Sequence, residues 1–366
     1  SWYRRQRQMC IRDRSTGYDI ISKSLYGELA FNFENSSTLS VGFRHEARDI
    51  DYFDFDNPSA SFDLDGNWNT SYKVAYEMHP ASNLHWYIYA AEGYHPAGVN
   101  QNPYLDMEDK TYDDEIYIDV TTGIRWYTDN IKLSTSLFYL EHDGHIFETS
   151  EQLDPSNPNA FAFFKQNADS GYEYGSETSG EFKLNDRFSM GLSLGLLSSE
   201  IEFGDHAEHG DEHGEDDHDE DHDEDHDEDH DEDHDDHGDD HDDHGGHEGH
   251  AEHGQKAHAP NWNYSLTFNY NFTEDSSLMV EIAGKDAFIF DSQNDSYESD
   301  PYHLLNAYYS HSFNKIRLGV YAKNILDESY ADRGFIFGLE PPHFHEKLYK
   351  SFGPPREIGM SLTYSF

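Results

Sequence analysis

The sequence predicts an all-β protein, a transmembrane antiparallel β-barrel, on the basis of three observations. Aromatic residues make up 15% of its 366 residues although the mean hydropathy is low, at −0.91. Apolar and polar residues alternate along many segments, as where Tyr264, Leu266, Phe268, Tyr270 and Phe272 are separated by polar residues. Short turns alternate with long polar connections between these segments, which is the layout of outer-membrane barrels.

Composition excludes several other classes. A disordered acidic protein would contain few aromatic residues. No run of eighteen apolar residues exists, which excludes a transmembrane helix, whereas the strands of a membrane barrel are apolar on one face only. The net charge is −50, and 27 acidic residues lie between Asp205 and Glu252 without any Lys or Arg. Subtracting them leaves −23, which is still unfavourable for binding nucleic acid.

The first fourteen residues, SWYRRQRQMCIRDR, differ from the rest of the chain. They include the only cysteine, Cys10, so neither a disulfide framework nor a cysteine-based zinc site is expected. The segment resembles sequencing-adapter read-through, with a genuine basic arm as the alternative. We therefore expect residues 1–14 to be non-native and residues 15–366 to form part of a barrel. No apolar signal-peptide core is visible at the start.

Thirteen strands are predicted from the alternation. They lie near residues 18–33, 38–53, 69–78, 83–93, 115–127, 131–148, 161–183, 187–203, 262–272, 277–290, 302–313, 315–326 and 356–366. A soluble β-sandwich would also alternate, but it rarely keeps short turns at one end and long loops at the other. Complete bacterial barrels have an even number of strands, so thirteen indicates a truncated barrel.

Four elements, in order along the chain, carry a family resemblance. They are Glu92 to Asn100 (EGYHPAGVN), Asn167-Ala168 with Gly171 and Glu173, Val320 to Tyr330 (VYAKNILDESY), and the terminal strand Arg356 to Phe366. Together they resemble the barrel of TonB-dependent outer-membrane receptors. The resemblance implies a 22-stranded barrel in the bacterial outer membrane, with an N-terminal plug and TonB box upstream of this segment. It also implies contact with outer-membrane lipid and with the TonB complex, a transport function rather than an enzymatic one, and no required cofactor.

The terminal strand resembles the signal that the barrel-assembly machinery recognises. Gly359, Leu362, Tyr364 and Phe366 fit that signal. These residues would equally suit a last strand that presents its apolar side chains to lipid, and both interpretations can hold together.

Residues 205–258 form a His/Asp-rich segment in which histidine recurs every four residues from His218 to His234. The segment has no apolar face, so we expect a disordered extracellular loop. Imidazole and carboxylate groups together suit zinc, and copper or nickel also bind imidazole. A solvated acidic tract is the alternative. The metal-binding candidates, taken collectively, are His206, His209, His213, His218, His222, His226, His230, His234, His237, His241, His244, His247, His250 and His253.

Other histidines carry weaker indications. His343 and His345 lie on a second predicted external loop and could receive metal from the tract. His142 and His145 end a predicted strand at the same side, where exposed histidines more often have no role. No catalytic triad, P-loop or HExxH motif occurs in the chain.

These observations predict a receptor for active uptake of a scarce nutrient, with zinc or another divalent metal as the first candidate. A ferric-siderophore, heme or cobalamin receptor with an incidental acidic loop is the alternative within the family. A surface adhesin barrel is the alternative of another class.

Overall fold

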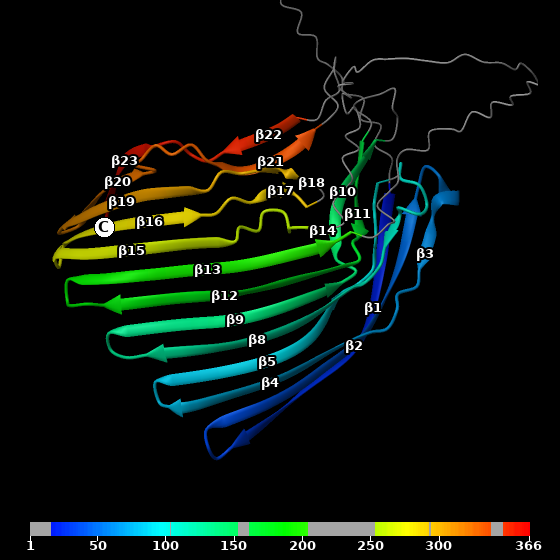
Figure 1. Ribbon diagram of the computed structural model, residues 1–366, viewed down its shortest axis with the longest axis horizontal. Helices are drawn as coiled ribbons and strands as arrows, with labels where there is room; N and C mark the ends of the chain where they lie inside the picture. The colour runs from blue at the N-terminus through cyan, green and yellow to red at the C-terminus, as the bar shows by residue number, and fades with distance from the viewer. Residues whose placement is uncertain (1–15, 103, 153–160, 204–252, 293, 338–346) are drawn as a thin grey trace, which may run out of the picture.

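A computed structural model describes residues 16–102, 104–152, 161–203, 253–292, 294–337 and 347–366. In these residues the chain forms one large, curved antiparallel sheet in which each strand of the main path pairs with its neighbour along that path (Figure 1). The thirteen strands of this path, among the described residues, are β1 (Thr16–Phe33), β2 (Ser37–Asp54), β4 (Asn69–Ala81), β5 (Leu84–His95), β8 (Glu115–Tyr127), β9 (Ile131–Asp143), β12 (Ser170–Lys183), β13 (Phe188–Glu202), β15 (Trp262–Thr273), β16 (Ser276–Lys285), β19 (Tyr302–Phe313), β20 (Ile316–Lys323) and β23 (Glu357–Tyr364).

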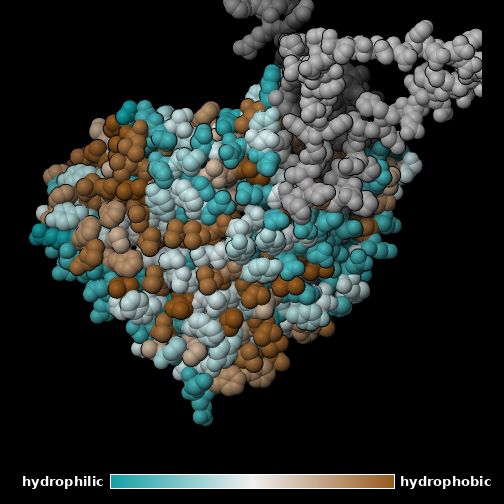
Figure 2. Space-filling view, in the orientation of Figure 1, coloured by the Kyte–Doolittle hydropathy of each residue, from teal (hydrophilic) through white to brown (hydrophobic). Residues whose placement is uncertain are grey.

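Period-two alternation gives the sheet one apolar and one polar face. In the β13–β15 pair, Leu192 lies opposite Leu266 and Met190 lies opposite Phe268, so the apolar residues of both strands share a face. Large apolar side chains on this face remain exposed, with Leu137 at 59% and Leu362 at 72%. Figure 2 shows hydrophobic side chains at the surface across the main sheet. Such extensive exposure of apolar side chains is typical of a sheet whose apolar face contacts lipid.

The two ends of the sheet differ in the length of their connections. At one end, the turn end, the connections are 34–36, 82–83, 128–130, 184–187, 274–275 and 314–315. At the other, the loop end, they are 55–68, 96–114, 144–169, 203–261, 286–301 and 324–356. This strict alternation confirms the predicted asymmetry.

The loop-end connections contain short elements of their own. These are the 3-10 helix η1 (Pro58–Ala60) and strands β3 (Phe62–Leu64), β6 (Gly98–Val99), β7 (Thr111–Tyr112), β10 (Ile146–Gln152), β11 (Phe161–Asn167), β14 (His253–Gly254), β17 (Ile289–Asp291), β18 (Asn294–Glu298), β21 (Ala331–Phe337) and β22 (Lys347–Phe352). β3 and β14 join the main sheet, and the others form the two-stranded pairs β6–β7, β10–β11, β17–β18 and β21–β22.

The buried apolar clusters of the described residues lie in these connections rather than in the main sheet. Leu105, Ala162 and Phe164 form one of them. Phe288, Phe290 and Ala331 form the other, with Tyr297 and Leu348 packed against it. Each cluster joins side chains from different connections, so the loop end is held together by packing between its own hairpins. No helix among the described residues has the length and apolar character needed to cross a membrane.

The thirteen predicted strands are confirmed in number and order, and the larger differences in extent occur at three of them. The strand predicted at 131–148 ends at Asp143, and the one at 161–183 divides into β11 and β12, because a β10–β11 hairpin stands between them. The strand predicted at 277–290 ends at Lys285, ahead of the β17–β18 hairpin. Alternation continues through these hairpins because they are strands themselves, so periodicity alone could not separate them from the main sheet.

Candidate functional site

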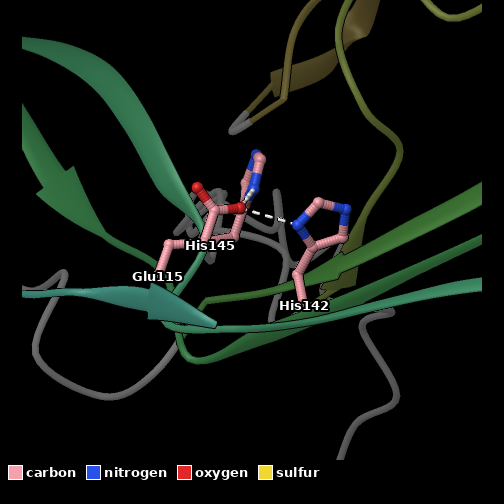
Figure 3. Close-up of side chains that lie close together, drawn as sticks. All are labelled: Glu115, His142 and His145. Carbon is pink, nitrogen blue, oxygen red and sulfur yellow. Dashed lines mark hydrogen bonds and ion pairs between the residues drawn. The ribbon is translucent and has the colours of Figure 1, made fainter. Parts of the chain in front are cut away.

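A cluster of one glutamate and two histidines lies at the loop end of the sheet. Nδ1 of His142 is 2.6 Å from Oε1 of Glu115, and Nδ1 of His145 is 2.9 Å from the same oxygen. Figure 3 shows the carboxylate of Glu115 with the two imidazoles directed toward it. One carboxylate oxygen therefore interacts with both rings.

Strand register places two of these three residues together. Tyr117 of β8 pairs with His142 of β9, so their side chains project on the same face of the sheet. Glu115 lies two residues before Tyr117 on β8 and therefore shares that face. The residues that these strands expose on the apolar face, such as Ile118 and Tyr139, have the opposite parity. Glu115 and His142 thus lie on the polar face.

Gly144 brings the third residue to the cluster. Its φ of +69° is left-handed, and a Cβ atom there would lie 2.9 Å from the backbone oxygen of Asp114. Both constraints favour glycine. The chain turns sharply after β9 and returns His145 toward Glu115, instead of continuing as a strand. The side chain of Asn167 stabilises this turn through two hydrogen bonds of 2.8 Å. Its Oδ1 accepts one from the N–H of Asp113, and its Nδ2 donates the other to the carbonyl of Gly144.

A second carboxylate and a lysine lie behind His142. Oε1 of Glu173, on the neighbouring strand β12, is 3.5 Å from Nε2 of His142. Nζ of Lys256 is 2.5 Å from the same Glu173 oxygen. Lys256 belongs to the long connection 203–261, only two residues beyond β14.

The cluster is largely shielded from solvent and lies beyond the apolar band of the sheet. The side chains of Glu115, His142 and His145 are 12%, 11% and 15% exposed. Along β9, the residues on the apolar face include Leu137 and Tyr139, followed by the exposed carboxylates Glu141 and Asp143. A carboxylate at that position would be unfavourable in hydrocarbon, so this part of the strands projects past the lipid-facing segment.

The charges in the cluster support one another. Burial alone would lower the pKa of His142, but its hydrogen bond with Glu115 and the negative charges of Glu115 and Glu173 raise it to about 9. Burial alone would raise the pKa of Glu115, but its contacts with His142 and His145 hold it well below its usual range. The pKa of Glu173 is lowered to about 2, because contacts with His142 and Lys256 outweigh its burial. Without a metal, Glu115, His142 and Glu173 are therefore all charged at neutral pH.

The donor set is suited to a divalent metal. One atom from each of Glu115, His142 and His145 lies within 4.8 Å of the others. Two imidazole nitrogens and one carboxylate oxygen form a ligand set that zinc accepts, with the fourth position left for water or another ligand. Zinc bonds of about 2.0–2.1 Å require the ligand atoms to be about 3.3 Å apart, so each ring would have to withdraw by less than about 1 Å. Calcium prefers an all-oxygen set, so it suits the cluster less well.

The metal-binding residues predicted from the sequence fall mostly outside the described residues. This applies to His206 through His250 and to His343 and His345; for His253 only the backbone, in β14, is described. Residues 1–14 also lie outside. The metal-binding role of all these histidines stays a prediction.

The terminal residues are described, although their role in assembly also stays a prediction. Gly359, Leu362 and Tyr364 lie in β23, whereas Phe366 follows the end of that strand. Leu362 and Tyr364 are exposed.

Sequence reasoning missed Glu115 and gave His142 and His145 only a weak indication. The available signal was the Asp143-Gly144 dipeptide between the two histidines, a pair of residues that often marks a turn. A turn there would have placed both imidazoles at one point. Among the described residues, His79 and His85 are another histidine pair near a carboxylate. Their rings stack near the turn end, and His85 lies 3.1 Å from Glu77.

The fold and the arrangement of its surfaces define a class of protein. A curved antiparallel sheet with one exposed apolar face, short turns at one end and long connections at the other is the architecture of a bacterial membrane β-barrel. The chain belongs to the TonB-dependent receptor family, because the family model described as TonB dependent receptor-like, beta-barrel matches residues 2–325. Members of this family are outer-membrane transporters and receptors rather than enzymes.

Solved structures share this fold. The ferric yersiniabactin uptake receptor FyuA from Yersinia pestis has a TM-score of 0.64 at 15% identity, over 96% of this chain and 46% of that chain. The copper transporter OprC has a TM-score of 0.63 at 12% identity, over 95% of this chain and 48% of that one. The siderophore receptor PiuA from Acinetobacter baumannii has a TM-score of 0.62 at 14% identity, over 95% and 44%. The chain spans about half the length of these structures.

Proposed function

We propose that this chain is the barrel portion of an outer-membrane receptor that takes up a divalent metal, with zinc as the first candidate. The observation that carries the proposal is the convergence of Glu115, His142 and His145 on the polar face at the loop end. In a membrane barrel the polar face lines the interior. Metal ligands at that place would bind cargo near the mouth of the barrel.

The His/Asp-rich segment supports the same substrate. Its C-terminal end lies near the cluster in space, because Lys256 contacts Glu173, which faces His142. The candidate ligand His253 is three residues before Lys256. A tract with many interchangeable imidazoles would concentrate metal weakly. The ordered cluster would then bind it at one defined site.

The ligand types suit zinc without distinguishing it from copper or nickel. Copper and nickel also bind imidazole, and affinity for such sites generally rises from nickel to copper. OprC, which shares the fold, is a copper transporter, and FyuA and PiuA are receptors for ferric yersiniabactin and a siderophore. If this receptor instead takes up a ferric siderophore, heme or cobalamin, the cluster is incidental to transport.

Family membership supports a proposal for the orientation and the partners of this chain. We place the loop end outside the cell, lipid around the apolar face, and TonB as the periplasmic partner that drives uptake. Protease added to intact cells that produce the full-length receptor should cut within residues 205–258. Cleavage only after the outer membrane is opened would reverse this orientation. An adhesin would need no TonB, so zinc accumulation that persists unchanged without TonB would remove the transport proposal.

Growth under metal limitation tests the substrate. Cells whose only zinc receptor is this protein should grow slowly in zinc-depleted medium when it carries E115Q together with H145Q. The control is H85Q, which removes the histidine of the His85–Glu77 pair near the turn end. A defect confined to iron-limited medium would overturn the zinc proposal in favour of a ferric chelate.

A further inference from the structure

His142 lies between two carboxylates, with a different ring nitrogen directed at each. Nδ1 is 2.6 Å from Oε1 of Glu115, and Nε2 is 3.5 Å from Oε1 of Glu173. Histidines that bind metals commonly donate the second ring N–H to a carboxylate, which fixes the orientation of the ring and makes it a better ligand. Glu173 is therefore in position to support His142 as a ligand through Nδ1.

Lys256 forms an ion pair with the same carboxylate oxygen of Glu173. Its Nζ lies 2.5 Å from Oε1 of Glu173, the atom that faces Nε2 of His142. Nε2 of His142 is buried, and its 3.5 Å separation from Glu173 is too long to give it a hydrogen bond. The ammonium group and the imidazole N–H thus compete for one acceptor, and in this structure the ammonium has the shorter contact.

The backbone around Lys256 is fixed independently of this ion pair. The N–H of Lys256 donates to Oγ of Ser199 at 3.2 Å, and the N–H of Ala257 donates to Oγ of Ser292 at 2.8 Å. These bonds attach the returning end of connection 203–261 to the sheet and to the neighbouring connection. The lysine side chain can therefore leave Glu173 and return without rearranging the backbone, so its effective concentration at the site stays high.

We propose that Lys256 sets the metal affinity of the Glu115–His142–His145 cluster by competing for Glu173. This inference rests on the proposed function, and it concerns regulation of the same site. A metal at the cluster favours a strong hydrogen bond from Nε2 of His142 to Glu173, and its positive charge repels the ammonium of Lys256. Because coupling between two sites is reciprocal, the Lys256–Glu173 ion pair weakens metal binding as much as the metal weakens that pair.

Such an arrangement is useful in a receptor that must release its cargo. Three protein ligands with full outer support would hold zinc tightly and pass it on slowly. An ammonium that returns to Glu173 withdraws that support and promotes dissociation. Lys256 would therefore make binding reversible without removing any ligand.

The experiment compares zinc affinities of variants of the full-length receptor purified in detergent. Zn²⁺ is titrated in competition with a chromophoric chelator, and heat-modifiable gel migration confirms that each variant is folded. K256Q should bind zinc about tenfold more tightly than the wild type, within the usual range of coupling between sites. K256R, which keeps the charge, should remain near the wild type. E173Q should weaken binding by about 10- to 100-fold.

A double variant provides the decisive comparison. If Lys256 acts through Glu173, K256Q should no longer tighten binding when E173Q is already present, and the two effects should not add. Weaker or unchanged binding in K256Q, or equal tightening in both backgrounds, would overturn the proposal. Zinc binding that E115Q leaves unchanged would show that the metal site itself is wrong, and the role of Lys256 would fall with it. Normal affinity shifts in a receptor that fails to support growth on scarce zinc would leave Lys256 in place and reject the uptake function alone.

Discussion

Nδ1 of His142 lies 2.6 Å from Oε1 of Glu115, although the two residues are 27 positions apart in the sequence. They come from one hairpin, β8–β9, whose short turn at 128–130 lies at the opposite end of the strands. The contact therefore depends on the register of the whole hairpin. A shift of one residue would move His142 to the apolar face.

Removal of any one ligand should greatly weaken zinc binding. Loss of an outer-shell partner typically weakens metal binding by about 10- to 100-fold. We expect a larger loss of zinc affinity in each of the variants H142N, H145N and E115Q. Titration of Zn²⁺ against a chelator, with the folded full-length receptor, measures this. H85Q, in the other histidine–carboxylate pair, should retain wild-type affinity. Equal losses in H85Q and H142N would show that zinc binds elsewhere.

Zinc binding to the cluster should strengthen as the pH rises from 7 toward 9. Although burial lowers the pKa of His142, Glu115 and Glu173 raise it to about 9, so the metal must displace a proton from this ring at neutral pH. The apparent affinity should increase by up to about tenfold per pH unit and then level off. Calorimetry in buffers with different ionisation enthalpies should detect the released proton. A pH-independent affinity between 7 and 8.5 would contradict this assignment.

The same shift has a consequence for stability in the metal-free protein. The pKa of His142 in the folded protein lies above the ordinary histidine value of about 6.5. Charged His142 therefore contributes stability that is fully present below about pH 6.5. This contribution declines as the pH rises through about 9. Zinc should therefore protect the loop end against protease most clearly on the alkaline side of this range.

Alanine at position 144 should weaken zinc binding although Gly144 carries no ligand. Its left-handed φ and the 2.9 Å approach of a Cβ atom to the Asp114 carbonyl both oppose any side chain, so the turn that places His145 would shift. We expect G144A to lose about tenfold or more in affinity, because outer-shell displacement of a ligand has effects of that size. The matched control is G191A, where a Cβ would meet its nearest neighbour at 3.6 Å. Identical affinities in the two variants would remove the proposed role of the turn.

The His/Asp-rich tract should respond to pH in a different window. Its imidazoles have an unperturbed pKa of about 6.5, which surrounding carboxylates should raise. Zinc capture by a peptide of residues 205–258 should fall steeply between about pH 7.5 and 5.5. Replacing its histidines with asparagine should abolish strong zinc binding and leave weak calcium binding. If both peptides bind zinc equally, the tract is only a solvated acidic segment.

Much of the fold could be predicted from the sequence because its signals are local. Alternation of Tyr264, Leu266 and Phe268 with polar residues depends only on the geometry of a single strand, and turns such as Asn314-Lys315 are local in the same way. Thirteen strands, their order and the difference between the two ends follow from such patterns. The sequence also determined the family, and the family model matches residues 2–325, which contain the first two of the four elements and part of the third.

The candidate site was decided by tertiary structure. Glu115 is one acid among 74 acidic residues, and nothing in its immediate neighbours distinguishes it. Its role depends on the strand register that places it beside His142 and on the turn at Gly144. The alternation of apolar and polar residues does not by itself reveal that turn. Lys256 reaches Glu173 across 83 positions, over a connection whose length carries no information about where it returns. Strand periodicity is a property of neighbouring residues, whereas a metal site requires a few atoms from distant residues to meet within a few ångströms, and only the folded chain fixes those distances.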